Sequence, residues 1–143
     1  MENSGHKLIP IKEGLFTTPL TALDEVKLIG SKCNKCGEVT LGKASCCPNC
    51  VSEDMKEIPL SRRGKLWTYT VIRHRPPGNY RGPDPFAPFG EGLVELPEGI
   101  QVLSVLDGDV DTLKIGMDLE LVVYKLYRDE EGNDVVAFKF KPV

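Results

Sequence analysis

The residues of this sequence with the clearest chemistry are four cysteines, arranged as two Cys-x-x-Cys pairs. The first pair is Cys33 and Cys36, and the second pair is Cys47 and Cys50. Each tight turn presents two sulfur atoms on one side of its backbone, so two such pairs can close four thiolates tetrahedrally around one Zn²⁺. Ten residues separate the pairs, which is long enough for a short hairpin that returns the second pair to the first. We therefore predict a zinc site, with reduced structural thiols or disulfides as the alternatives.

The expected role of this zinc is structural. Four thiolates leave no open coordination position, so the metal stabilises the chain and takes no part in a reaction. Gly37 relieves the backbone where it turns under the metal, and Pro48 stiffens the second turn. Cys46 is the fifth cysteine, and its use in place of Cys47 would stretch the second pair by one residue. We expect Cys46 to be either a small buried residue or a residue that contacts the ligands, without the features of an activated thiolate.

The distribution of cysteines and apolar residues predicts a cytoplasmic protein. All five cysteines lie between positions 33 and 50 of the 143 residues, so they serve one local site and not a disulfide framework spread over a secreted fold. Residues 1–12 contain no apolar core of signal-peptide length. No later stretch approaches the roughly 20 apolar residues that span a bilayer.

A second candidate site lies in a basic, proline-rich part of an acidic protein. The net charge is −3, but residues 59–83 contain six basic and no acidic side chains. Residues 76–92 are rich in proline and glycine, and loops of this length in compact domains are often functional. The alternative is a rigid cover over one end of a barrel, with its aromatic residues as ordinary core.

The elements that must position these residues divide the chain into three parts. Residues 1–30 are expected to form an N-terminal arm and a short helix, residues 31–58 a zinc ribbon, and residues 59–143 a β domain. In the arm, apolar residues are interrupted by proline and glycine, which predicts a segment that is disordered or laid on a partner. The apolar spacing of residues 20–29 favours a short helix that runs into an extended entry to the first cysteine pair. Residues 52–58 are interpreted as a polar link.

The rest of the chain alternates apolar and polar residues in short runs, as strands do. Strands are predicted from residue 64 to 73, 93 to 96, 100 to 106, 117 to 127 and 135 to 140, with turn residues between them. The fold class is therefore mainly β. Five strands without an interior helix favour a small barrel, and the five-stranded OB-fold is the natural candidate.

The order of these parts resembles a known family that joins a rubredoxin-like zinc ribbon to an OB-fold and was long catalogued as a domain of unknown function. The resemblance covers residues from about 15 to 143. Its markers are the four cysteines, Gly64 with Thr68 and Thr70, the Pro76-Pro77-Gly78 run, residues 93–99 and residues 113–117. Family members are companion subunits of acyl-CoA enzymes. Residues 14–17 and 28–33 are similar to the thiolase-associated branch.

The resemblance implies a catalytic partner and a site for coenzyme A or acyl-CoA shared with it. Coenzyme A carries a diphosphate and a 3′-phosphate, which arginine can bind with paired donors. Its adenine and pantetheine need an aromatic or apolar surface. The candidate residues that face coenzyme A or the partner flank and line the loop: Arg73, Arg75, Pro76, Pro77, Tyr80, Arg81 and Phe86. Salt bridges from these arginines to an acidic partner surface are the alternative.

Three functions remain open at this stage. The first is a non-catalytic subunit that completes or gates the site of a thiolase, because His6 and His74 are the only histidines and no catalytic set is evident. The second is a companion of an acyl-CoA hydratase, which differs only in the partner. The third is a single-stranded nucleic-acid module that stacks bases on Trp67 and Tyr69. The acidic net charge counts against that third function.

Overall fold

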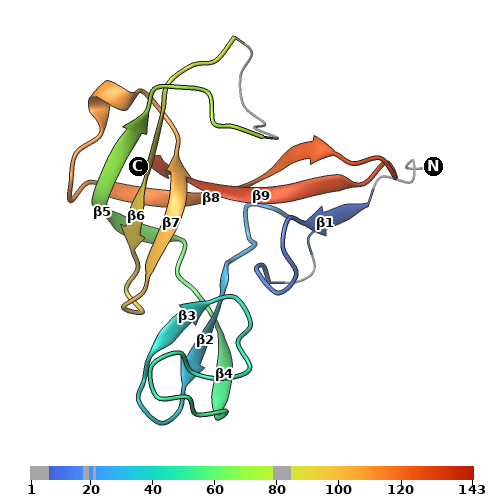
Figure 1. The fold of residues 1–143 in the computed structure, drawn as a ribbon, viewed down its shortest axis with the longest axis vertical. Coiled ribbons are helices and arrows are strands. Elements are labelled where there is room, and N and C mark those ends of the chain that lie inside the picture. The colour runs from blue at the N-terminus through green and yellow to red at the C-terminus, as the bar shows by residue number, and fades with distance from the viewer. Residues whose placement is uncertain (1–6, 18–19, 21, 79–84) are drawn as a thin grey trace.

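The structure, a computed structural model, describes residues 7–17, 20, 22–78 and 85–143. Within these ranges the chain is built from strands and one short 3₁₀ helix. Its strands form two sheets, a larger one that closes into a barrel and a three-stranded one that contains the cysteines (Figure 1). In the described ranges no helix is long and apolar enough to cross a membrane.

The barrel consists of five strands in the order β5-β6-β7-β9-β8. Their bounds are Arg63–Ile72 for β5, Phe89–Glu95 for β6, Gln101–Leu106 for β7, Asp118–Arg128 for β8 and Asp134–Pro142 for β9. Pairing of β5 with β8, from Arg63 opposite Glu120, closes the barrel. Between β7 and β9 the pairing is parallel and consists of Leu106 opposite Phe140. This arrangement confirms the predicted five-stranded barrel.

Alternation along the strands produces the core of the barrel. In β7 every second residue is buried, and in β8 Leu119, Leu121 and Val123 point inward, where Phe140 of β9 is fully buried. Gly64 and Gly92 allow neighbouring strands to approach closely. A Cβ atom at Gly92 would lie 2.4 Å from the carbonyl oxygen of Thr68, so a larger residue there would push β5 and β6 apart.

The zinc ribbon sheet has the order β3-β2-β4, with β2 at Ile29–Cys33, β3 at Val39–Leu41 and β4 at Met55–Pro59. The interpretation of residues 52–58 as a polar link was wrong, because β4 pairs with the whole of β2, from Ile29 opposite Pro59 to Cys33 opposite Met55. Because β4 is an edge strand of a small sheet, its polar residues stay in water.

The predicted helix at residues 20–29 is absent from the described part of the arm. One turn hydrogen bond joins the Glu25 N–H to the Ala22 carbonyl. The Ile29 N–H then donates to the Leu15 carbonyl at 2.8 Å, and Phe16 forms a bridge with Leu28. These extended segments bury their apolar side chains in the core, whereas an isolated helix of ten residues would be marginal.

The expectation that the arm is disordered or laid on a partner was also wrong for residues 7–17. β1, at Leu8–Pro10, pairs in parallel with β9 from Leu8 opposite Asp134. Leu15 and Phe16 belong to the chain's own hydrophobic core, being 5% and 3% exposed. Residues 7–17 of the arm therefore pack on the chain's own sheet and core.

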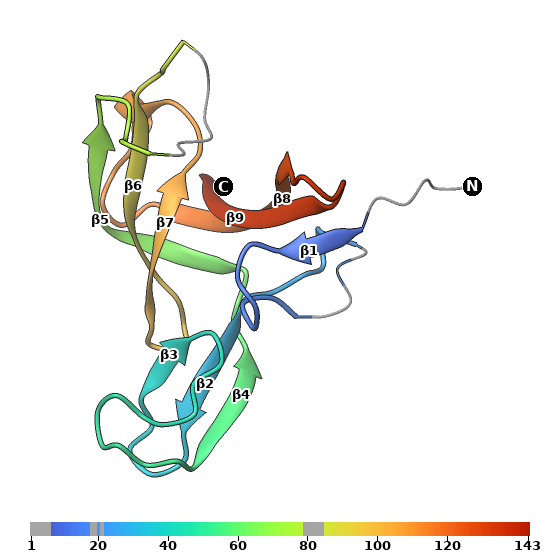
Figure 2. The ribbon, with the colours of Figure 1, turned by 45° about the vertical axis from the view of Figure 1, so that its right-hand side comes forward.

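Residues 60–62 connect the ribbon sheet to the barrel (Figure 2). Their side chains bind to three other parts of the chain. Leu60 is fully buried, and the Ser61 hydroxyl donates to Glu98 Oε2 at 2.7 Å. The Arg62 guanidinium donates to the carbonyls of Val26 and Leu121, the latter at 2.9 Å. One short segment thus binds the arm, the β6–β7 turn and β8 together.

Candidate functional site

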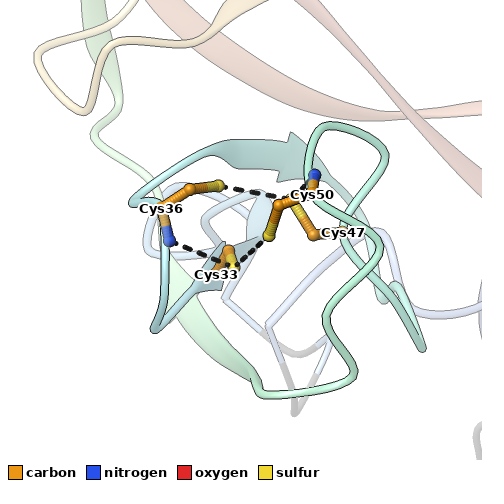
Figure 3. Close-up of side chains that lie close together, drawn as sticks. All are labelled: Cys33, Cys36, Cys47 and Cys50. Atoms are coloured by element: carbon orange, nitrogen blue, oxygen red, sulfur yellow. Dashed lines mark hydrogen bonds between the residues drawn. The ribbon is translucent and has the colours of Figure 1, made fainter.

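The four cysteines of the two pairs converge at one end of the ribbon sheet. Cys33 ends β2, Cys36 lies in the following turn, and Cys47 and Cys50 come from the loop before β4. The Sγ atoms of Cys33 and Cys50 are 3.5 Å apart, as are those of Cys36 and Cys47, and all four lie within 4.8 Å of one another. Figure 3 shows their sulfur atoms directed toward a common centre.

Each pair forms the same local structure, a tight turn whose backbone surrounds the first sulfur. The N–H groups of Lys35 and Cys36 point at Cys33 Sγ at 3.4 and 3.5 Å. In the second turn Asn49 and Cys50 do the same for Cys47 Sγ, at 3.3 and 3.5 Å. Backbone donors of this kind stabilise a thiolate, which is the form that binds a metal.

The electrostatics of the cluster call for a cation. The Cys36 backbone N–H, together with that of Lys35, lowers the pKa of Cys33 to about 6 against the effect of burial. For Cys50 the N–H of Ser52 acts in the same lowering direction, but the neighbouring Cys33 sulfur and burial outweigh it and raise the pKa to about 11. Four thiolates at this separation repel one another, and a divalent cation at their centre would offset this electrostatic repulsion.

The donor set fits Zn²⁺. With Zn–S bonds of about 2.3 Å, tetrahedral geometry places the sulfurs about 3.8 Å apart, close to the 3.5 Å separations of the two closest pairs. Bound here, zinc would supply a structural crosslink between the two turns. Cys33 and Cys47 hold it from the buried side, and Cys36 and Cys50 from the exposed side.

Two details of the cluster differ from the sequence-based interpretation. Cys46 is exposed and not buried beside the ligands, because the buried position goes to the adjacent ligand Cys47. The ten-residue spacer forms no hairpin of its own, since its one strand, β3, pairs with β2. Sequence reasoning missed Asn49, whose amide lies 3.6 Å from Cys36 Sγ. Its position inside the second Cys-x-x-Cys turn was the available signal.

The described ends of the loop between β5 and β6 lie at the opposite end of the molecule from the ribbon sheet that carries the cysteines (Figure 1). Arg73 and Arg75 follow β5 directly and are exposed, as is Pro77, while Pro76 is half-buried. Phe86 precedes β6 and packs edge-to-face on Phe89, with ring centroids 6.2 Å apart. Tyr80 and Arg81 lie outside the described residues.

The structure brings the two ends of this loop together. Ile72, the last residue of β5, is paired with Phe89, the first of β6. Arg73 therefore follows the last paired residue of β5, at the base of the loop. Among the described residues, Arg73 has no ion pair. The loop thus begins at an exposed cation and ends at an aromatic pair.

The other basic residues of this region serve the fold. Arg62 binds the two carbonyls described above, Lys65 pairs with Asp118 at 2.8 Å, and Arg63 lies 4.0 Å from Glu120. Lys65 also holds the pKa of the Asp118 carboxyl below its usual value, through a hydrogen bond and through its charge. The expected basic face is thus reduced to the end of β5 that leads into the loop.

Comparison with known proteins agrees with this arrangement. Residues 20–56 match the model of the ChsH2 rubredoxin-like zinc ribbon domain, and residues 57–124 match that of the ChsH2 C-terminal OB-fold domain. The chain is 33% identical over 117 residues to the benzoylsuccinyl-CoA thiolase subunit BbsA of Geobacter metallireducens, covering 81% of this chain and 75% of the relative. The chain belongs to the ChsH2-type family of zinc ribbon and OB-fold proteins.

The chain is also similar to other proteins with these domains. A DUF35 domain-containing scaffold protein of Pyrococcus furiosus is 37% identical over 123 residues, covering 84% of this chain and 86% of the relative. Among solved structures, the chain resembles the "Ltp2-ChsH2(DUF35) aldolase" with a TM-score of 0.62 and 27% identity, covering 81% of this chain and 84% of that one. The sequence-based assignment to this family is therefore confirmed.

Proposed function

We propose that this chain is a non-catalytic accessory subunit of a thiolase, an acyl-CoA C-acyltransferase, and that it helps to form or gate the acyl-CoA site of the complex. The observation that carries the proposal is its similarity, over three quarters of the relative's length, to a benzoylsuccinyl-CoA thiolase subunit. The attacking cysteine and its histidines belong to the catalytic partner. The zinc cluster of this chain supports folding, because its four thiolates occupy every position of a tetrahedral site.

The part of the chain proposed to meet coenzyme A is the loop between β5 and β6. Arg73 and Arg75 supply guanidinium donors for its phosphates. The aromatic surface formed by Phe86 and Phe89, at the other end of the loop, supports binding of adenine or pantetheine. Pro76 and Pro77 limit the conformations of the loop, which lowers the entropy lost when ligand or partner binds. Tyr80 and Arg81 are assigned to the same surface from the sequence.

We assign 2-benzoylsuccinyl-CoA, an intermediate of anaerobic toluene degradation, as the substrate of the complex. Relatives from Geobacter metallireducens and Thauera aromatica that carry the name of that thiolase support this choice, at 33% and 30% identity. A hydratase partner is the alternative within the same family. The nucleic-acid function has no support beyond the OB-fold itself.

Co-purification tests the proposal. The tagged chain is isolated from its own host through a sizing column, and the bound proteins are identified by mass spectrometry. We expect a thiolase-type chain in stoichiometric amount. A hydratase in its place would redirect the assignment, and a monomeric zinc protein without any acyl-CoA enzyme would overturn it.

A further inference from the structure

The outer face of the barrel strands β5, β6 and β7 carries large apolar side chains in contact with water. Leu103 of β7 is 60% exposed, Trp67 of β5 is 50% exposed, and Val105 of β7 is 36% exposed. Isolated apolar residues on a protein surface are ordinary, whereas a contiguous group with a polar border marks an interaction site. An interaction site at this face therefore requires that these residues lie next to one another.

The strand register shows that they do. Leu93 of β6 is opposite Leu103 of β7 on one side and opposite Thr68 of β5 on the other. Trp67 immediately precedes Thr68, at a bulge where the register with β6 shifts. Leu103, Leu93 and Thr68 therefore form a row across three adjacent strands, which lie side by side in Figure 1, and the exposed Trp67 extends this row at the bulge beside Thr68. We call this row, with Val105, the apolar face.

The row continues beyond β5. Ile115, which is 69% exposed, lies in the connection that runs beside this strand. The N–H of the next residue, Gly116, donates to the Leu66 carbonyl at 2.7 Å, which holds Ile115 next to the Trp67 segment. The exposed apolar residues thus extend over the width of four neighbouring chain segments.

The border of the apolar face is acidic. Glu91 and Glu95 lie two residues before and after Leu93 on β6, so their side chains leave the sheet on the same side. Neither glutamate has an ion pair among the described residues. Lys65 is opposite Glu95 in the register, but its amine is bound to Asp118 at 2.8 Å.

We propose that the apolar face is the docking surface for the catalytic acyl-CoA subunit, at a patch of that subunit that is apolar in its centre and bordered by lysine or arginine. This inference rests on the proposed function, and it names where the partner binds. The unpaired glutamates favour a basic border on the partner. They disfavour a second copy of this chain, because self-association would bring Glu91 and Glu95 against the same two acids.

The apolar face is also continuous with the proposed coenzyme A loop. The strands that carry Trp67 and Leu93 lead directly into that loop, and the pair of Ile72 and Phe89 closes its base. A partner seated on the apolar face therefore reaches Arg73 without a change in the barrel. The apolar face thus binds the partner, and the loop binds the ligand.

The test uses the thiolase-type subunit that co-purifies with the chain, prepared separately and titrated by calorimetry. Leu103→Glu introduces a charge at the centre of the apolar face, at a position exposed enough to tolerate it in the free chain. We expect binding of the subunit to weaken at least about tenfold. The matched control is Ile11→Glu, an apolar residue 48% exposed that lies beyond β1, which should bind as the unmodified chain does.

A second variant keeps the test independent of Leu103. Glu91→Lys alters only the border, and we expect slower association, with a weaker dependence on salt than the unmodified chain shows. Circular dichroism and zinc content verify that both variants fold.

Three outcomes overturn the inference. Unchanged binding of Leu103→Glu and Glu91→Lys, with the complex still formed, removes the docking surface and leaves the proposed function in place. A dimer of the free chain that Leu103→Glu dissociates assigns the face to a second copy. A failure of the unmodified chain to bind any acyl-CoA enzyme overturns the proposed function and the docking surface together.

Discussion

Gly37 and Val51 occupy equivalent positions in the two zinc turns, and both have positive φ angles, 83° and 65°. Each directly follows the second cysteine of its pair, and each donates its N–H to the carbonyl of the first cysteine, at 3.0 and 2.9 Å. Glycine adopts this conformation without strain, whereas a β-branched residue does not. The second turn therefore holds strain that the first lacks.

Replacement of this valine should stabilise the protein. Val51 is 74% exposed, so Val51→Gly loses little packing while relieving a backbone strain of about 1 kcal/mol or more. We expect a higher midpoint of thermal unfolding. Gly37→Val should lower it by a comparable amount. Val105→Gly, on a regular strand, is the control and should destabilise. A lower midpoint for Val51→Gly would show that the turn is not strained.

Loss of one zinc ligand should unfold the ribbon selectively. Cys33→Ser removes a thiolate from a closed four-sulfur site, so we expect loss of the single bound zinc. Amide hydrogen exchange should become faster in β2, β3 and β4 than in the barrel. Cys46→Ser is the matched control, since Cys46 is exposed and is no ligand, and it should retain the metal. One zinc per chain retained by Cys33→Ser would contradict the assigned ligand set.

Acidification should weaken zinc binding. Metal binding requires the deprotonated ligands, and without metal the Cys50 thiol, with its pKa raised to about 11, is protonated at neutral pH. Zinc therefore displaces protons, and its affinity falls as the pH falls, most steeply below the lowered pKa of about 6 of Cys33. Competition with a chromogenic chelator from about pH 8 to about pH 5 measures this. An affinity independent of pH would exclude thiolate ligands.

Arg62 and Arg73 should have opposite roles although both are arginines of the same region. The Arg62 guanidinium binds two backbone carbonyls, so Arg62→Ala should lower the free energy of unfolding by about 2 kcal/mol or more. It should leave the affinity of the complex for coenzyme A unchanged. Urea unfolding checks the first effect and calorimetry with coenzyme A checks the second.

Arg73→Ala should show the reverse pattern. Arg73 is exposed at the start of the loop, so its removal should leave stability unchanged within about 0.5 kcal/mol. Loss of a phosphate contact should reduce coenzyme A affinity of the complex about tenfold. Lys56→Ala, which removes an exposed cation from β4, is the control for net charge. Equal affinities for Arg73→Ala and Lys56→Ala would assign the loop to another role.

The parts of this fold that the sequence predicted are those with a strong local signal. The spacing of the two cysteine pairs is enough to predict the zinc turns, and the alternation of apolar and polar residues in 64–73 and 117–127 is enough to predict two strands. The arm has no such local signal, because Leu15 and Phe16 become core residues only when residues 15–17 pair with residues 27–29. The sequence also did not predict β4, because the residues of this strand are extended through their pairing with β2 and not through a pattern of their own.

The candidate site was only partly predictable, for physical reasons of the same kind. Six basic residues looked equivalent in the sequence, but Arg62, Arg63 and Lys65 are turned to carbonyls and acids that lie far along the chain. The positive φ of Val51 had no signal, because valine ordinarily avoids it. The apolar face emerged from strand register, which composition does not encode.

If this chain completes the acyl-CoA site of a catalytic partner, turnover by the reconstituted complex depends on it. Thiolysis of 2-benzoylsuccinyl-CoA is measured with the catalytic subunit alone, with the chain added, and with the Arg73→Ala chain added. We expect kcat/KM to rise when the unmodified chain is added and to fall back with the Arg73→Ala chain, while the complex itself still forms. A catalytic subunit equally active alone would contradict this expectation.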